Sequence, residues 1–208
     1  MQQNSPEWFA ARLGRVTASR VADVVAKTKT GWGASRAAYM GTLVAERLTG
    51  VPFPTYENEA MKLGREREPE ARNLYAFIHG VEVEEVGFIQ HPTIAMSGAS
   101  PDGQVGKKGL VEIKCPKTHT HIATLLGGSI DKVYDLQMQW QMACTDRLWV
   151  DFVSYDPMMP ENMRLHVQRV NRSESTIDML EKEVIVFLDE LNDQIAQLKF
   201  KFGERDAA

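Results

Sequence analysis

GLVEIKCP, residues 109–116, has the composition of one buried β-strand that ends at a proline. Side chains alternate between the two faces of a strand, so Glu112 and Lys114 share one face and Ile113 points to the other. The neighbouring positions are apolar, and an unpaired charge in such surroundings is costly. The two charged side chains therefore need partners or a function.

A second carboxylate precedes this strand. Asp102 lies in the run SPDG, residues 100–103, which is typical of a tight turn and can deliver a side chain to the end of the neighbouring strand. Two carboxylates and a lysine suit Mg²⁺-assisted phosphodiester hydrolysis, in which the lysine orients the nucleophile or stabilises the transition state. Taken alone, SPDG is an ordinary turn, and a D…E-x-K pattern occurs by chance in many proteins. The apolar residues that flank Glu112 favour the nuclease.

Length and composition predict one domain over residues 1–208. The chain is 43% hydrophobic, enough for a full core, and no repeat or linker divides it. Cys115 and Cys144 form no CxxC pair and are interpreted as buried small side chains, and the five histidines lack a zinc-binding spacing. The sequence shows neither a signal peptide nor an apolar run of about 20 residues, which predicts a cytoplasmic protein without a membrane partner.

Charge is distributed unevenly along the chain. The formal net charge is −4, yet residues 1–50 contain seven basic and three acidic residues. A basic N-terminal part on an acidic body fits an enzyme that grips a polyanion at one edge and gathers metal ions elsewhere. Ordinary surface asymmetry explains the same numbers equally well.

The pattern of apolar residues and turn signals predicts a mixed α/β fold, with helices flanking a central mixed sheet. Thr17 is the expected N-cap of the first helix, Gly50 ends the second, and Pro69 must kink the third helix or begin a fresh one. His119 and His121 are expected in a loop. The expected helices are 19–26, 35–48, 58–79, 130–143 and 174–199, and the expected strands are 81–90, 94–98, 109–115, 147–155 and 164–170.

Several further residues have two interpretations. Glu68 lies in a charge-rich run that favours a solvated helix face. Gln137 and Gln141 share one face of the expected helix, and Gln137 has two interpretations, a simple polar helix face or a contact with the site. The row of Met138 and Met142 favours core packing.

Several N-terminal residues also have two interpretations. Ser19 near a helix N-terminus, together with Arg12, fits either a phosphate site or a plain cap and a surface arginine. The aromatic and basic side chains that can line a path for DNA are Trp8, Trp32, Lys27, Lys29 and Arg36, although Trp8 also suits a core.

The chain resembles the phage lambda exonuclease family, also called YqaJ-type viral recombinases, within the PD-(D/E)XK nuclease superfamily. The runs that carry the resemblance occur in order along nearly the whole chain. They are Arg12-Leu13-Gly14, Thr17-Ala18-Ser19, Gly64 to Glu68 with Ala71, Ser100 to Gly103, Glu112 to Pro116, Gln137-Met138-Gln139 and Phe202-Gly203-Glu204.

The resemblance implies a PD-(D/E)XK core and assigns roles to individual residues. Asp102, Glu112 and the main-chain carbonyl of Ile113 would bind Mg²⁺, and Glu68 would help to hold a second ion, with Mn²⁺ as a substitute. Lys114 would serve the attacking water, and Gln137 would approach the same site. A 5′-phosphate pocket would be formed by Arg12, Ser19 and Ser100.

The implied activity is 5′-to-3′ digestion of double-stranded DNA ends, which releases mononucleotides and leaves a 3′ single strand for a phage-type single-strand annealing protein. The family also implies a ring-shaped homotrimer. The alternatives are another PD-(D/E)XK enzyme such as an endonuclease, and a non-catalytic protein that binds DNA ends during recombination.

Overall fold

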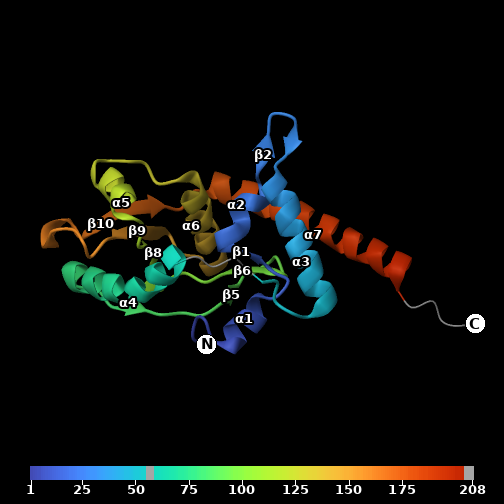
Figure 1. The fold of residues 1–208 in the computed structure, drawn as a ribbon, viewed down its shortest axis with the longest axis horizontal. Helices are drawn as coiled ribbons and strands as arrows, with labels where there is room; N and C mark the ends of the chain where they lie inside the picture. The colour runs from blue at the N-terminus through green and yellow to red at the C-terminus, as the bar shows by residue number, and fades with distance from the viewer. Residues whose placement is uncertain (55–58, 204–208) are drawn as a thin grey trace, which may run out of the picture.

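The computed structural model describes residues 1–54 and 59–203 (Figure 1). Its centre is a five-stranded sheet in the order β10-β9-β8-β7-β4, where β8 (Gly109–Lys114) and β9 (Trp149–Tyr155) are parallel and the other pairs are antiparallel. The remaining strands are β10 (Leu165–Asn171), β7 (Gly103–Val105) and β4 (Val83–Glu84). The mixed α/β class predicted from the sequence is confirmed.

Helices cover both faces of this sheet because its central strands are apolar on both sides. Val111 and Ile113 pack with α4 (Glu59–His79) on one face, through Ala71 and Tyr75. On the other face, Leu110 and Phe152 pack against Met138 and Met142 of α6 (Lys132–Thr145) and Ile177 of α7 (Glu174–Phe202). The prediction that the methionine row is core is confirmed.

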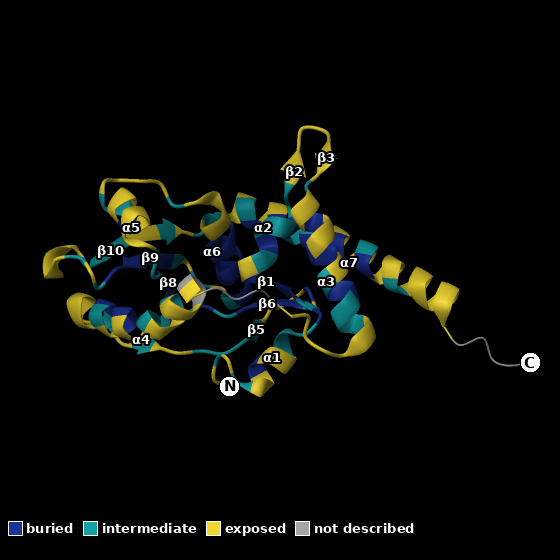
Figure 2. Cartoon of the chain, viewed as in Figure 1, coloured by how far each residue is buried: buried dark blue, intermediate teal, exposed yellow. Residues whose placement is uncertain are grey.

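A second core lies beside the sheet, around the helices that hold the N-terminal part of the chain. Tyr39 of α3 (Ala34–Thr49), Trp140 of α6 and Phe187 of α7 are all buried in it. A small sheet, with β1 (Val16–Thr17), β6 (Ser97–Ala99) and β5 (Ile89–Gln90) in that order, connects this region to the central sheet. Figure 2 shows α6 buried between the two regions, whereas the end of α7 is exposed.

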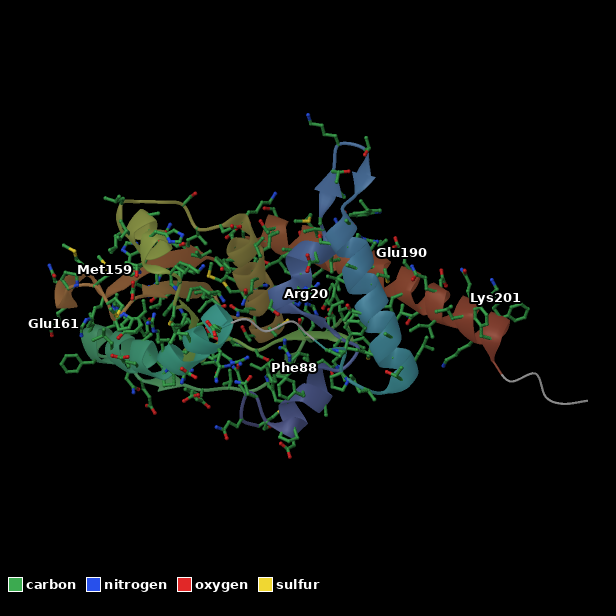
Figure 3. All side chains as sticks on the ribbon, in the orientation of Figure 1. Arg20, Phe88, Met159, Glu161, Glu190 and Lys201 are labelled. Atoms are coloured by element: carbon green, nitrogen blue, oxygen red, sulfur yellow. The ribbon has the colours of Figure 1, made fainter. Side chains whose placement is uncertain are left out.

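Three short elements complete the N-terminal part and one lies after β8. They are α1 (Pro6–Arg12), α2 (Val21–Val24), the hairpin of β2 (Lys27–Thr28) and β3 (Gly31–Trp32), and α5 (Thr118–Leu125). The hairpin projects from the body beside α3 (Figure 1). Figure 3 places Met159 and Glu161, between β9 and β10, at the opposite end of the molecule from Lys201 on α7.

The structure corrects several boundaries. The helix expected over 19–26 is a 3₁₀ turn, Ala18–Arg20, followed by the four-residue α2, and Thr17 makes no side-chain capping bond. The strand expected over 81–90 is split between β4 and β5 because the chain crosses from one sheet to the other. Helix α4 continues through Pro69, so no fresh helix begins there; Asn58, its expected first residue, lies outside the described residues.

Sequence reasoning missed α5 and β7, and the loop predicted for His119 and His121 is wrong. Both histidines lie in α5, whose polar sequence lacks an apolar period. His121 is fully buried, with Nδ1 2.8 Å from Ser154 Oγ and Nε2 2.8 Å from the carbonyl oxygen of Met163. Two hydrogen bonds to partners distant in sequence satisfy this side chain, which no local pattern predicts.

The two cysteines are unpaired: Cys144 is buried and Cys115 half-buried. Burial raises the pKa of the Cys115 thiol to about 12, so the thiol stays protonated at neutral pH and is a poor nucleophile. None of the helices in the described part of the chain is long and apolar enough to cross a membrane.

Candidate active site

The SPDG turn brings Asp102 to β8, as predicted. It connects β6 to β7, which pairs with β8, and the Asp102 carboxylate accepts a hydrogen bond of 2.7 Å from the main-chain N–H of Ile113. Glu112, the residue before Ile113 on the strand, is 1% exposed. Two carboxylates separated by ten residues in the sequence therefore lie at the same end of one strand.

Three donors surround the Glu112 carboxylate on the face that the strand turns toward α6. Lys114 Nζ lies 2.5 Å from Oε1, which confirms that the two charged side chains share a face. Gln137 donates to the same oxygen at 2.6 Å, and Gln141 donates to Oε2 at 2.5 Å. The polar face of α6 thus belongs to the site and is not a solvated surface.

The site has an excess of negative charge. The pKa of Asp102 is raised well above its ordinary value, first by burial and then by the charges of Glu112 and Glu68, against the opposing effect of Lys114. The pKa of Glu68 is also raised, by burial first, while Arg72 opposes the shift. For Lys114, burial acts to lower the pKa, but the nearby Glu112 and Asp102 outweigh it and the pKa is raised.

The donor set fits a hard divalent cation. Mg²⁺ is usually held by one or two carboxylates and keeps several water ligands. Asp102 and Glu112 meet that requirement, and a cation would offset the repulsion that raises the pKa of Asp102. Among residues 1–54 and 59–203, no three acidic, histidine or cysteine side chains are grouped closely enough to enclose a metal by themselves. The charge of Glu68, on α4, contributes to the raised pKa of Asp102, but the Glu68 carboxylate is paired with Arg72 at 2.5 Å.

A second polar cluster lies near the N-terminus. The Ser100 hydroxyl accepts hydrogen bonds from Trp8 Nε1 at 2.9 Å and from Arg12 Nη1 at 3.2 Å. The Arg12 guanidinium also lies 4.1 Å from the centre of the Trp8 indole, and burial lowers the pKa of Arg12. Trp8 is itself 9% exposed, so it serves both the core and this cluster.

A cavity of about 290 Å³ adjoins Arg12. Three more arginines line it, namely Arg15, Arg20 and Arg65, together with Tyr39 and Glu46. Arg20, labelled in Figure 3, precedes α2 and stacks on Tyr39, 4.5 Å from its ring centre. Ser19 does not line the cavity; its hydroxyl is 3.4 Å from Thr17 Oγ1, and it lies in the 3₁₀ turn, not at the start of a full helix.

The residues expected along a DNA path lie in different environments. Lys29 is exposed in the β2–β3 hairpin, and Lys27 is paired with Glu183 at 2.8 Å. Arg36 is only 5% exposed, bound to Glu190 at 2.7 Å and to the Val24 carbonyl at 3.1 Å. In this structure Arg36 ties α3 to α7 and does not face solvent, contrary to the expected contact with DNA.

Residues 7–148 match the YqaJ-like viral recombinase domain. The chain belongs to this family. It is 53% identical to an alkaline exonuclease, LHK-Exo from Laribacter hongkongensis, over 95% of this chain and 97% of that one, with a TM-score of 0.88. A structure of LHK-Exo with dAMP gives a TM-score of 0.89. The protein is an exonuclease of the YqaJ-like family.

Two further matches are more distant. A phage-related exonuclease from Haemophilus somnus shares the fold, with 16% identity over 88% of this chain and 96% of that one and a TM-score of 0.68. An uncharacterized protein of Acanthamoeba polyphaga mimivirus is 29% identical over 168 residues. That match covers 73% of this chain but only 29% of the mimiviral protein.

The site of this YqaJ-like exonuclease includes residues that sequence reasoning did not assign to it. Gln141 contacts Glu112 as closely as Gln137 does, and its spacing of four from Gln137 was the available signal. Tyr134 lies one turn earlier on α6, with its ring centre 5.0 Å from Lys114 Nζ. No sequence pattern predicted that the arginines of the cavity lie together, because Arg15, Arg20 and Arg65 are brought together only by the fold.

The excess charge predicts that Asp102→Asn stabilises the metal-free protein while removing activity. A raised pKa means that the folded state holds a proton which the unfolded state has released, so wild-type stability falls as pH rises above the unfolded pKa of about 3.9. The asparagine in the variant does not ionise, so the variant does not lose stability in this way as the pH rises. In EDTA, urea unfolding should show the variant more stable than wild type at pH 8, with a smaller difference at pH 5. A variant less stable at both pH values would contradict the charge argument.

Proposed function

We propose that this chain is a Mg²⁺-dependent 5′-to-3′ exonuclease that digests the 5′-phosphorylated strand of double-stranded DNA ends and releases mononucleotides. The observation that carries the proposal is the buried Glu112 of β8, which is paired with Lys114 while Asp102 binds the main chain of the next residue, Ile113, in a chain 53% identical to an alkaline exonuclease. The complex of LHK-Exo with dAMP supports a mononucleotide product. The 3′ strand left behind would serve a phage-type single-strand annealing protein.

The proposed chemistry divides between the chain and the ion. Asp102, Glu112 and the main-chain carbonyl of Ile113 would hold Mg²⁺, or Mn²⁺ in its place, and Glu68 would help to hold a second ion. The metal would neutralise charge on the phosphate and lower the pKa of a bound water. Lys114 would orient the attacking water or offset the charge that develops on the phosphate. Gln137 would hold Glu112 and lies close enough to this carboxylate to contact water or phosphate beside it.

The geometry favours catalysis over a purely binding role, because a protein that only holds DNA ends gains nothing from two buried carboxylates, which repel phosphate. An endonuclease of the same superfamily would use the same residues. Incubation with linear duplex and with closed circular DNA, each with and without Mg²⁺, separates the three possibilities. Mononucleotides released from linear DNA only, and only with Mg²⁺, are expected; cut circles, or retention without cleavage, would overturn the proposal.

Replacement of Lys114 tests the assigned mechanism. Lys114→Ala removes a cation but no metal ligand, so cleavage should fall by about 10²-fold or more while DNA binding in Ca²⁺ stays near wild type. Lys117→Ala is the matched control, because Lys117 is exposed on the segment that follows the strand. Turnover within a few-fold of wild type in Lys114→Ala would exclude this role for the lysine.

The N-terminal cluster predicts a preference for 5′-phosphorylated ends. We propose that Arg12 and Ser100 bind the terminal phosphate. Ser19 and Trp8 would lie near this phosphate, and Lys27 and Lys29 would contact the duplex. A charged hydrogen bond of this kind is worth about 1.5–3 kcal/mol, or about tenfold to a hundredfold in kcat/KM.

Arg12→Ala should therefore slow digestion of 5′-phosphate ends by that factor and leave 5′-hydroxyl ends nearly unchanged. Lys29→Ala, which removes an exposed charge from the hairpin, should slow both substrates equally. If Arg12→Ala also slows both ends equally, Arg12 has a general DNA-binding or structural role.

We further propose a ring-shaped homotrimer around DNA. Its support, beyond the family resemblance, is the apolar end of α7, where Phe200 is 95% exposed and Phe202 72%. Large apolar side chains gathered on an exposed surface are typical of association sites. Light scattering should give about three times the chain mass of 23.4 kDa; a monomer that digests DNA processively would contradict the ring.

A further inference from the structure

Gln141 contacts the reacting groups only through Glu112, and its environment differs from that of an ordinary core glutamine. It is fully buried on α6, one turn beyond Gln137, and its amide nitrogen lies 2.5 Å from Glu112 Oε2. Within the described part of the chain, its own carbonyl oxygen is buried and accepts no hydrogen bond. The carboxylate is thus held at both oxygens by α6, through Gln137 at Oε1 and Gln141 at Oε2.

Stability does not explain this arrangement. A buried carbonyl without a donor costs free energy, and the neighbouring buried positions Met138 and Met142 show that this part of α6 packs well with apolar side chains. A methionine at 141 would fill a similar volume without an unpaired oxygen. Local costs of this kind are typical of functional positions.

The chemistry of the two donors fits the orientation of a metal ligand. A carboxylate has about four acceptor positions, and Lys114, Gln137 and Gln141 occupy three of them, which leaves one for a cation. An amide is neutral, so it fixes the carboxylate without cancelling the negative charge that attracts the ion. An arginine in the same place would hold Glu112 equally well and weaken its attraction for a cation.

We infer that Gln141 is a positioning residue, which together with Gln137 fixes the orientation of the Glu112 carboxylate for a divalent cation. The inference rests on the proposed function, because it takes Glu112 as a metal ligand. Gln141 touches neither DNA nor metal in this role. Its loss should weaken metal binding by tenfold to a hundredfold, the usual effect of removing a group that orients a ligand.

The test measures Mn²⁺ binding to the full chain without DNA, from the electron paramagnetic resonance signal of free Mn²⁺. Gln141→Met, which keeps the volume, and Gln141→Asn, which keeps the amide but is too short to reach Glu112, should both bind Mn²⁺ about 10- to 100-fold more weakly than wild type. Two variants are used so that either decides the result if the other fails to fold. Excess Mn²⁺ should restore kcat in both, with KM for DNA unchanged.

Gln139→Met is the matched control. Gln139 lies on the same helix and is buried, but its amide donates to the Asn171 carbonyl at 3.0 Å and its oxygen accepts from Ser173 N at 2.9 Å, away from Glu112. This variant should lose thermal stability and keep its Mn²⁺ affinity. If it loses Mn²⁺ affinity as strongly as the Gln141 variants, disturbance of α6 explains the effect and the positioning role is overturned.

Glu112→Gln separates this inference from the proposed function. If Glu112→Gln abolishes Mn²⁺ binding and the Gln141 variants bind like wild type, the positioning role is wrong and the metal site stands. If Glu112→Gln binds Mn²⁺ as tightly as wild type, or wild type does not bind it, the proposed metal site fails and the inference fails with it.

Discussion

Burying the carboxylate of Glu112 on an apolar strand costs free energy that other groups must offset, and the surrounding structure is arranged around that requirement. The strand itself supplies Lys114, two positions away on the same face. Helix α6 supplies two amides, and its methionines at 138 and 142 pack in the core against Leu110 and Phe152. No single partner would suffice, since Lys114 alone leaves Oε2 without a donor.

The sheet separates packing from chemistry. Helices cover both faces of β8, α4 on one side and α6 on the other, so every side chain on it must either pack or be paired. Val111 and Ile113 meet α4 on one face, while Glu112 and Lys114 meet α6 on the other. Even the main chain contributes, because the N–H of Ile113 fixes Asp102. The two carboxylates are therefore positioned by elements that the apolar core already holds in place.

The centre of this site was predictable from the sequence and its periphery was not. The alternation along GLVEIK and the SPDG turn placed Glu112, Lys114 and Asp102 correctly, because both signals are local. The structural placement of Arg36 depends on Glu190, which is 154 residues away, so a basic side chain was read as a surface group. His121 was misplaced for the same reason. The helix expected at Ser19 is wrong, because the chain forms a 3₁₀ turn and a four-residue helix there and a candidate capping residue does not distinguish these from one longer helix.

The turn that carries Asp102 also links the two parts of the proposed site. Ser100 accepts hydrogen bonds from Trp8 and Arg12, and Asp102, two residues later, binds the N–H of Ile113. Two residues span at most about 7 Å of extended chain. A 5′-phosphate held by Arg12 and Ser100 and a phosphodiester beside Asp102 would therefore both be positioned by one short turn, which Trp8 and Arg12 hold at one end and the N–H of Ile113 at the other.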